Sequence, residues 1–246
     1  MTYCLGILTQ KGLVMASDSR TNAGYDQVNV HRKMYTFVRP GERVLVILAS
    51  GNLSITQSVL ALLQKDWEQG QGLAQVTTLY DAAREIGAKV RAVSGMDRAA
   101  LENDDFKFNI NLLLGGQIKG EKHGLYLVYP QGNPLSASED SPYLQIGETK
   151  YGRPILDRGV RYDQTTLAEA AKFALISLDS TMRSNLTVGP PVDLVLYSEE
   201  ELDILHQKRF LDNDPELLHI RSQWEQTLRQ GIRDLPELRF WTDCKP

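Results

Sequence analysis

The order in which two hydrophobic periodicities alternate along the chain is the strongest constraint on its fold. Short apolar runs bounded by turn residues are typical of strands, and apolar residues spaced three and four apart are typical of helices. Along the 246 residues the order is strands, two helices, strands, two helices and strands. This α+β pattern predicts two stacked sheets with helices outside each, a four-layer αββα sandwich.

The predicted elements follow from these patterns. A hairpin turning at 10–12 opens the chain, and its first strand begins at residue 2. Further strands are predicted at 33–38, 43–49, 108–116, 124–129, 143–147, 192–197 and 202–205. Helices are predicted at 52–68, 79–93, 167–183 and 215–235, with a short one after 152, and polar loops at 21–30 and 94–107.

The chain is expected to form a single domain. It shows no internal repeat, low-complexity tract or composition break. Its length is sufficient to bury a substantial core. We therefore predict one domain over 1–246, with 214–246 as a C-terminal helical extension that packs on its own subunit or on a neighbour.

Composition excludes several classes of function. A net charge of −4 gives no overall support for a phosphate-binding surface, so nucleic acid is not an expected partner. No apolar run is long enough to span a bilayer, and the N-terminus lacks a signal-peptide pattern. We expect a cytoplasmic protein with no membrane association.

Metal and cofactor chemistry has no sequence signature here. The four histidines have no metal-ligand spacing, and neither a Gly-x-Ser-x-Gly elbow nor a nucleotide-binding loop is present. No metal and no cofactor are predicted. The two cysteines, Cys4 and Cys244, could tie the chain ends together, but reduced thiols are the usual state in an intracellular protein.

The second residue carries the most distinctive chemistry. A chain end that starts directly in a strand is held in place, whereas most chain ends fray. If Met1 is removed, Thr2 carries a hydroxyl nucleophile and a free α-amine on one residue. An α-amine has a pKa of about 7.7 to 8.0, so near neutral pH part of it is an unprotonated base. Cys4 is a lesser alternative nucleophile.

Three further residues stand at element boundaries that could meet Thr2. Asp18 ends the second strand, Lys33 opens the next apolar segment, and Gly51 lies between a buried strand and a helix. Each alone has a structural explanation: a turn cap, a surface charge and a helix-entry residue. Together, in this order and after a Thr2 start, they favour a catalytic group.

This order resembles the catalytic β subunits of proteasomes, and in particular the bacterial proteasome-like family called Anbu. The similarity lies in residues 2–7, Thr-Tyr-Cys-Leu-Gly-Ile, and 16–24, Ala-Ser-Asp-Ser-Arg-Thr-Asn-Ala-Gly, and in the Lys and the Ser-Gly turn that follow. The resemblance covers most of the chain. It implies the four-layer αββα fold of N-terminal-nucleophile hydrolases and the activity of an N-terminal threonine endopeptidase.

The resemblance also implies a role for each residue of the first group. The Oγ of Thr2 would attack a peptide carbonyl while its own α-amine accepts the proton. Lys33 would place a positive charge beside that hydroxyl, and Asp18 would hold Lys33. The backbone N–H of Gly51 would face the developing oxyanion.

A second group and the substrate-binding residues are likewise implied by the resemblance. The family places a Gly-containing turn with a hydroxyl residue here at Gly147-Glu148-Thr149, and an Asp at Asp179. Its Ser or Thr near that Asp falls on Met182, which departs from the family pattern, and we take Ser184 as the partner. Ala49 corresponds to a pocket floor, where a small residue leaves room for a larger apolar side chain. Arg20 is also assigned to substrate binding.

Two other functions are compatible with the same residues. One is a catalytically silent subunit that forms rings, and the other is an N-terminal-nucleophile amidase acting on a small amide. The resemblance implies a homo-oligomer, either a ring or an open helical ring, with a peptide or unfolded protein as substrate. Because no nucleotide-binding loop is present, ATP-driven unfolding would require a separate unfoldase or adaptor.

Overall fold

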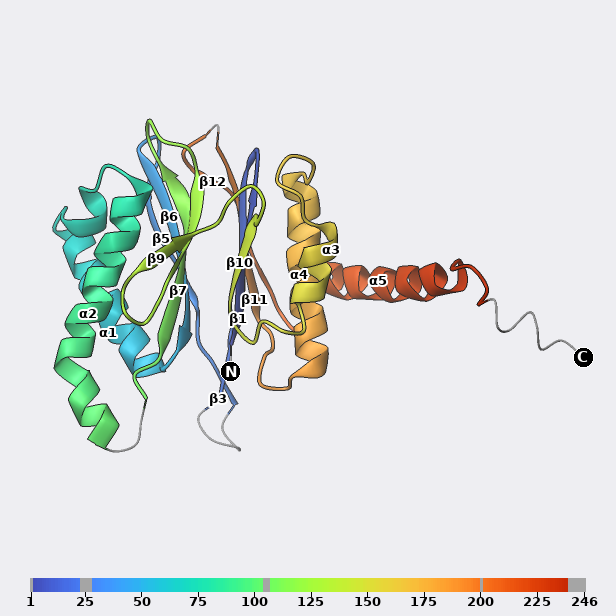
Figure 1. Ribbon diagram of the computed structural model, residues 1–246, viewed down its shortest axis with the longest axis horizontal. Helices are drawn as coiled ribbons and strands as arrows, with labels where there is room; N and C mark the ends of the chain where they lie inside the picture. Colours follow the sequence, from blue (N-terminus) through green and yellow to red (C-terminus); the bar gives the residue numbers. More distant parts are fainter. Residues whose placement is uncertain (1, 23–27, 104–106, 200, 239–246) are drawn as a thin grey trace, which may run out of the picture. The chain divides into compact units, whose positions relative to one another are not determined.

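The computed structural model describes residues 2–22, 28–103, 107–199 and 201–238 (Figure 1). The chain divides into two compact units, Met1–Asp212 and Asn213–Pro246. The predicted catalytic residues all lie in the first unit. Whether the second unit is an extension of the same domain stays a prediction.

The first sheet contains the strand that follows Thr2. Its order is β10 (Tyr143–Gly147), β1 (Tyr3–Thr9), β2 (Gly12–Asp18), β11 (Val192–Ser198) and β12 (Ile204–Phe210). All neighbours are antiparallel, and Tyr3 pairs with Gly147 while Cys4 pairs with Ser17. Since β1 has a partner on each side, the start of the chain is held within the sheet.

The second sheet follows the sequence order. Its strands are β5 (Met34–Arg39), β6 (Arg43–Gly51), β7 (Ile110–Ile118), β8 (Gly124–Val128) and β9 (Pro134–Ser136), all antiparallel. A separate two-stranded hairpin is formed by β3 (Arg20–Asn22) and β4 (Val28–Val30).

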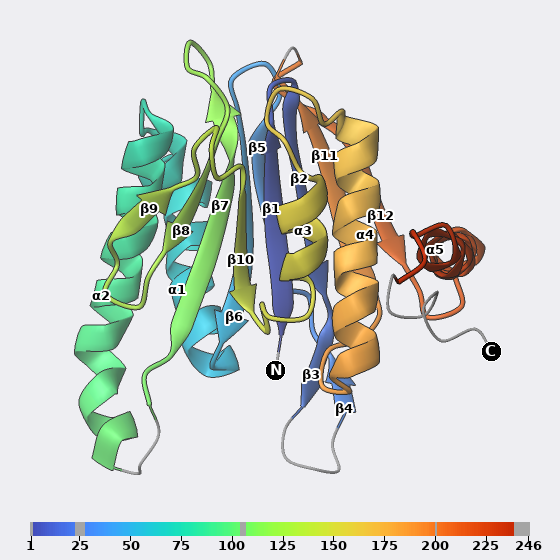
Figure 2. The same ribbon diagram turned by 45° about the vertical axis from the view of Figure 1, so that its right-hand side comes forward.

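Two pairs of helices cover the outer faces of the two sheets (Figures 1 and 2). Helices α1 (Leu53–Glu68) and α2 (Leu79–Asn103), joined through the short 3-10 turn η1 (Gly72–Ala74), lie on the β5–β9 sheet. Helices α3 (Arg153–Gly159) and α4 (Leu167–Ser184) lie on the sheet containing β1. The unit is therefore a four-layer αββα sandwich, which confirms the predicted fold.

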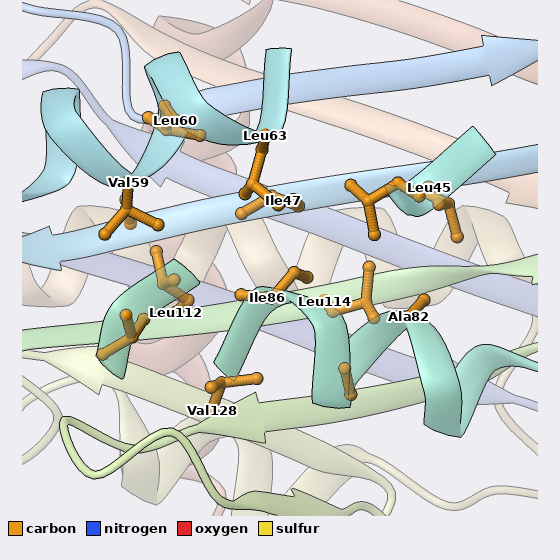
Figure 3. Close-up of a cluster of buried hydrophobic side chains, with 14 of the residues drawn as sticks. Leu45, Ile47, Val59, Leu60, Leu63, Ala82, Ile86, Leu112, Leu114 and Val128 are labelled. Carbon is orange, nitrogen blue, oxygen red and sulfur yellow. The ribbon is translucent and has the colours of Figure 1, made fainter. Parts of the chain in front are cut away.

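Separate apolar clusters join the layers. Between β5–β9 and its helices, buried side chains such as Ile47, Leu63, Ile86 and Leu114 interdigitate (Figure 3). Between the two sheets lies a second cluster that includes Cys4, Met15, Leu48 and Val195. Because the strands contribute alternate residues to these clusters, the strand ends at the Thr2 edge are fixed by packing on both faces.

Several elements differ from the sequence expectation. Helix α2 continues to Asn103 through residues predicted as a loop; Ser94 Oγ accepts from Arg98 Nε at 2.8 Å, and the Arg98 guanidinium stacks 4.7 Å from the Phe108 ring centre. Strand β12 continues to Phe210, because edge pairing with β11 supports a strand whose side chains are largely exposed. Strand β9 was not predicted, and the β3–β4 hairpin spans the segment 21–30 that was predicted as a loop.

The second unit contains the helix α5 (Pro215–Arg233). Asp214 caps it, since its side chain accepts from the backbone N–H groups of Glu216 and Leu217. The predicted helix at 215–235 thus ends two residues earlier. None of the helices in the described ranges combines the length and apolar character needed to cross a bilayer.

Candidate active site

Thr2 is held through its backbone from two sides. Its carbonyl oxygen accepts a hydrogen bond from the N–H of Glu148 at 2.7 Å. The next N–H along the chain, that of Tyr3, donates to Oδ1 of Asp18 at 3.0 Å. The turn after β10 and the end of β2 therefore position the residue that precedes β1.

The turn after β10 requires a glycine beside Thr2. Gly147 has φ +85°, and a Cβ built there would lie 1.9 Å from the carbonyl oxygen of Thr2. Both the left-handed backbone and the close approach exclude larger residues. The hydroxyl of Thr149 in this turn stays a prediction, and the N–H of the neighbouring Glu148 donates to the backbone of Thr2.

Asp18 and Lys33 form a buried ion pair. Lys33 Nζ lies 2.7 Å from Asp18 Oδ1 and donates also to the carbonyl oxygen of Arg20 at 2.6 Å. Asp18 is fully buried and Lys33 is 6% exposed. Burial raises the pKa of Asp18, and the Lys33 ammonium and the backbone N–H groups of Tyr3 and Gly189 oppose that increase. The ammonium is thus held in one position by two oxygens.

A cavity of about 420 Å³ brings four of the predicted residues together: Thr2, Lys33, Ala49 and Gly51. They come from the start of β1, the residue before β5 and the end of β6. Asp18 lies behind Lys33 and contacts it from the buried side. Among the described residues, no cluster of His, Cys, Asp or Glu is placed to hold a metal ion.

Gly51 at the mouth of this cavity has a backbone that other residues rarely adopt. Its φ is +117°, and an added Cβ would lie 2.3 Å from the carbonyl oxygen of Asn109 on the neighbouring segment. Asn52 then caps α1 by accepting from the N–H of Ser54 at 2.9 Å. The glycine therefore joins β6 to α1 while leaving its backbone exposed to the cavity.

The side chain of Arg20 lies against the loop after α4. Its Nη1 donates to the carbonyl oxygen of Leu186 at 2.7 Å, and its guanidinium packs on Gly189. What Arg20 contributes to Lys33 is its backbone carbonyl. These contacts do not support a role of the Arg20 side chain in substrate binding. That role stays a prediction.

The second predicted group includes Asp179 and Ser184, which lie at the end of α4. Asp179 is 5% exposed, and its Oδ2 accepts from Arg183 Nε at 3.2 Å. Ser184, the last residue of α4, is exposed, and its predicted pairing with Asp179 stays a prediction. Sequence reasoning missed Asn185, whose amide Nδ2 donates to Glu148 Oε2 at 2.9 Å. The Gly147-Glu148-Thr149 turn predicted this region of the site, but the prediction concerned the hydroxyl of Thr149 and not the carboxylate of Glu148.

Cys4 faces the core between the two sheets. It is fully buried, and burial raises the pKa of its thiol far above the ordinary value. Its Sγ lies 3.8 Å from the carbonyl oxygen of Ala49. A buried, protonated thiol is a poor nucleophile, which weakens the alternative of a cysteine-based reaction. Cys244 lies outside the described residues.

Known proteins resemble this chain in sequence. No protein-family model matches it. The proteasome subunit beta of Haloferax volcanii is 23% identical over 210 residues, covering 85% of this chain and 78% of the relative. The proteasome subunit beta 1 of Pyrobaculum arsenaticum is 23% identical over 203 residues, covering 82% and 92%.

Solved structures are more similar. Anbu, described as an ancestral beta-subunit, from Yersinia bercovieri is 45% identical with a TM-score of 0.90, covering 96% of this chain and 98% of that one. A Gly-1 mutant of Anbu from Hyphomicrobium sp. strain MC1 is 42% identical with a TM-score of 0.90, covering 97% and 99%. The chain in the helical assembly of the Anbu complex from Pseudomonas aeruginosa is 43% identical with a TM-score of 0.90, covering 96% of this chain and 98% of that one.

Proposed function

This chain belongs to the Anbu family, whose fold is that of proteasome β subunits, and from that membership we propose that it is an N-terminal threonine peptidase. The observation that carries the proposal is the cavity shared by Thr2 and Lys33, in which the ammonium is fixed 2.7 Å from the buried Asp18. A hydroxyl that faces the same cavity as a fixed positive charge is suited to nucleophilic catalysis without histidine.

The reaction begins once Met1 is removed. The Oγ of Thr2 attacks the carbonyl carbon of a peptide bond, and its proton passes to the α-amine of the same residue. Lys33 stabilises the developing alkoxide by its charge. The backbone N–H of Gly51 donates to the oxyanion, a type of contact worth about 3 to 4 kcal/mol in the transition state.

The second half of the reaction releases both products. The α-ammonium returns its proton to the leaving amine, and the acyl group remains as an ester on Thr2. A water molecule then attacks the ester, giving up a proton to the α-amine, and the carboxylic acid product leaves while Thr2 regains its hydroxyl.

Ala49 makes the cavity able to accept a large side chain. It lines the cavity wall with its small methyl group, beside the α1 layer. A longer residue at this position would fill the space next to Lys33. We infer that the peptidase accepts a larger apolar side chain at the cleaved bond.

Assembly follows from the family. The helical assembly reported for Anbu from Pseudomonas aeruginosa supports a homo-oligomer for this chain as well, as a ring or an open helical ring. Peptides or unfolded proteins would be its substrates, and any unfoldase would be a separate protein.

One experiment tests processing and reactivity together. Purified protein is treated with a peptide epoxyketone, and its intact mass is measured before and after. The proposal expects a chain that begins at Thr2 and gains one adduct, while Thr2→Ala gains none. A chain that keeps Met1 and forms no adduct would instead favour a catalytically silent subunit. An adduct without cleavage of any peptide, combined with hydrolysis of small amides, would favour the amidase.

A further inference from the structure

Glu148 is hydrogen-bonded directly to the backbone of Thr2. Its backbone N–H donates to the carbonyl oxygen of Thr2 at 2.7 Å, one step beyond the Tyr3–Gly147 pair. A residue bonded to Thr2 in this way has its Cα a few ångströms from the Thr2 backbone. Its side chain can therefore reach the α-amine of Thr2.

The carboxylate of Glu148 is held in a defined orientation. Asn185 Nδ2 donates to its Oε2 at 2.9 Å, and the side chain is 11% exposed. The amide of Asn185 cannot be reversed without loss, because its Oδ1 accepts from both the N–H and the Oγ1 of Thr187, at 3.0 and 2.6 Å. Glu148 thus presents a largely buried carboxylate with a fixed hydrogen-bond donor, on a residue whose backbone is hydrogen-bonded to Thr2.

The loop after α4 supports both carboxylates near Thr2. Asn185 at its start binds Glu148, and the N–H of Gly189 at its end donates to Asp18 Oδ2 at 3.2 Å. Asp18 already accepts from Lys33, Tyr3 and Gly189. Glu148 therefore offers an α-ammonium at Thr2 a carboxylate that is not already bound to Lys33.

We propose that Glu148, oriented by Asn185, is the carboxylate that binds the freed α-ammonium of Thr2 and holds its nitrogen beside Oγ. This inference rests on the proposed function only in taking Thr2 as the first residue of the mature chain. It replaces the expected hydroxyl of Thr149 and the Asp179–Ser184 pair with one charged group. Asn185 acts as a positioning residue through Glu148.

The charges around the α-amine oppose one another. Lys33 should lower the pKa of the freed amine, and Glu148 and Asp18 should raise it. Lys150 lies 3.6 Å from Glu148 Oε1 but is 67% exposed, so water screens its effect. Asp179 at the end of α4 is a further buried carboxylate, and its partner Arg183 is 56% exposed, so Asp179 should also raise this pKa. Neutralising Glu148 should therefore lower the pKa of the α-amine.

The test measures that pKa directly on the full chain, prepared by cleaving an N-terminal fusion so that Thr2 is the first residue. The α-amine is labelled competitively with acetic anhydride across a pH series, and the N-terminal peptide is quantified by mass spectrometry. Glu148→Gln should move the midpoint to lower pH by about one unit. Glu148→Asp, which keeps the charge, should move it less.

The matched control is Glu139→Gln, the same change on an exposed loop. This loop lies next to the far end of β1, where the N–H of Leu8 donates to Pro142, about 20 Å along the strand from Thr2. Its midpoint should equal that of the unmodified chain. If Glu148→Gln does not fold, Asn185→Leu, which removes the donor but keeps the carboxylate, should move the midpoint in the same direction.

The outcomes separate this inference from the proposed function, because labelling needs no substrate. A shifted midpoint in a protein that cleaves no peptide would support Glu148 and overturn the peptidase. An unshifted midpoint in Glu148→Gln, with peptide cleavage intact, would overturn the role of Glu148 and leave the peptidase standing.

Discussion

Lys33 and Asp18 meet at 2.7 Å with almost no access to water, and the same lysine borders the cavity that Thr2 faces. Asp18 at the buried end of β2 therefore fixes the position of the Lys33 ammonium at the cavity. A buried pair of this kind is costly to break on one side only, because the remaining charge keeps its desolvation cost.

Removing the cation alone should destabilise the folded protein more than removing both charges. We expect Lys33→Met to lower the free energy of unfolding by about 3 to 5 kcal/mol, since Asp18 is left buried and unpaired. The double variant Asp18→Asn with Lys33→Met should lose less. Urea denaturation of the single and double variants measures the difference. Arg153→Met, which breaks the exposed pair with Asp157, should change stability by less than about 1 kcal/mol.

Tyr3 should make stability depend on alkaline pH. Burial raises its pKa to about 12, and its OH hydrogen-bonds Ser177 Oγ at 2.6 Å. The unfolded phenol ionises near pH 10 while the folded one stays protonated, so stability should fall between about pH 10 and 12. Tyr3→Phe should remove the contribution of about one titrating proton from the pH dependence of the free energy of unfolding between about pH 10 and 12. Urea denaturation at several pH values measures this dependence. Tyr80→Phe, at an exposed position, should leave it unchanged.

Gly51→Ala should damage both folding and the site. The substitution combines a φ of +117° with a Cβ 2.3 Å from the carbonyl oxygen of Asn109. We expect a loss of at least about 2 kcal/mol in the free energy of unfolding. Gly41→Ala is the control, since φ is +73° but the added Cβ meets no described atom within 4 Å. Equal losses of unfolding free energy in the two variants would show that the close approach to the Asn109 carbonyl adds nothing, and would contradict this prediction.

Ala49→Leu should change substrate preference. Filling the cavity beside Lys33 should reduce cleavage after Tyr or Leu at least tenfold relative to cleavage after Ala, measured as kcat/KM ratios with a peptide series. Ala61→Leu, on an exposed position of α1, adds the same atoms outside this cavity and should leave the ratio unchanged. Similar rates after Ala and after Tyr in the unmodified protein would contradict the assignment of Ala49.

Cys4 should resist alkylation in the folded protein. Its burial and raised pKa leave little thiolate at pH 8. We expect iodoacetamide to modify Cys4 at least a hundredfold more slowly than in urea, as followed by peptide mass spectrometry. Rapid modification of Cys4 in the native protein would reopen the cysteine nucleophile.

The sequence predicts the layered core of this protein well, because its signals there are local. Runs such as 43–49 and the spacing of Ile86 and Val90 report burial directly. The β3–β4 hairpin and the second half of strand β12 were not predicted, for the opposite reason. Residues 206–209 of β12 are polar, as are most residues of the hairpin, and pairing with a neighbouring strand rather than burial makes these segments strands.

The candidate site shows a similar division. Asp18, Lys33 and Gly51 stand at element ends that a strand pattern locates, so their meeting could be anticipated. Glu148 and Asn185 could not be, since their contact depends on where the loop after α4 returns. Such a contact between distant segments leaves no periodic signal in the chain.

The order of pairing in the two sheets sets when the site can exist. Sheet β5–β9 is built from strands in sequence order and uses nothing beyond Ser136. Strand β1, in contrast, must await β10, and β2 must await β11 from Val192 onward. A nascent chain emerging from the ribosome therefore carries Thr2, Asp18 and Lys33 long before β10 and the loop after α4 can hold the backbone of Thr2 and the carboxylate of Asp18 in place.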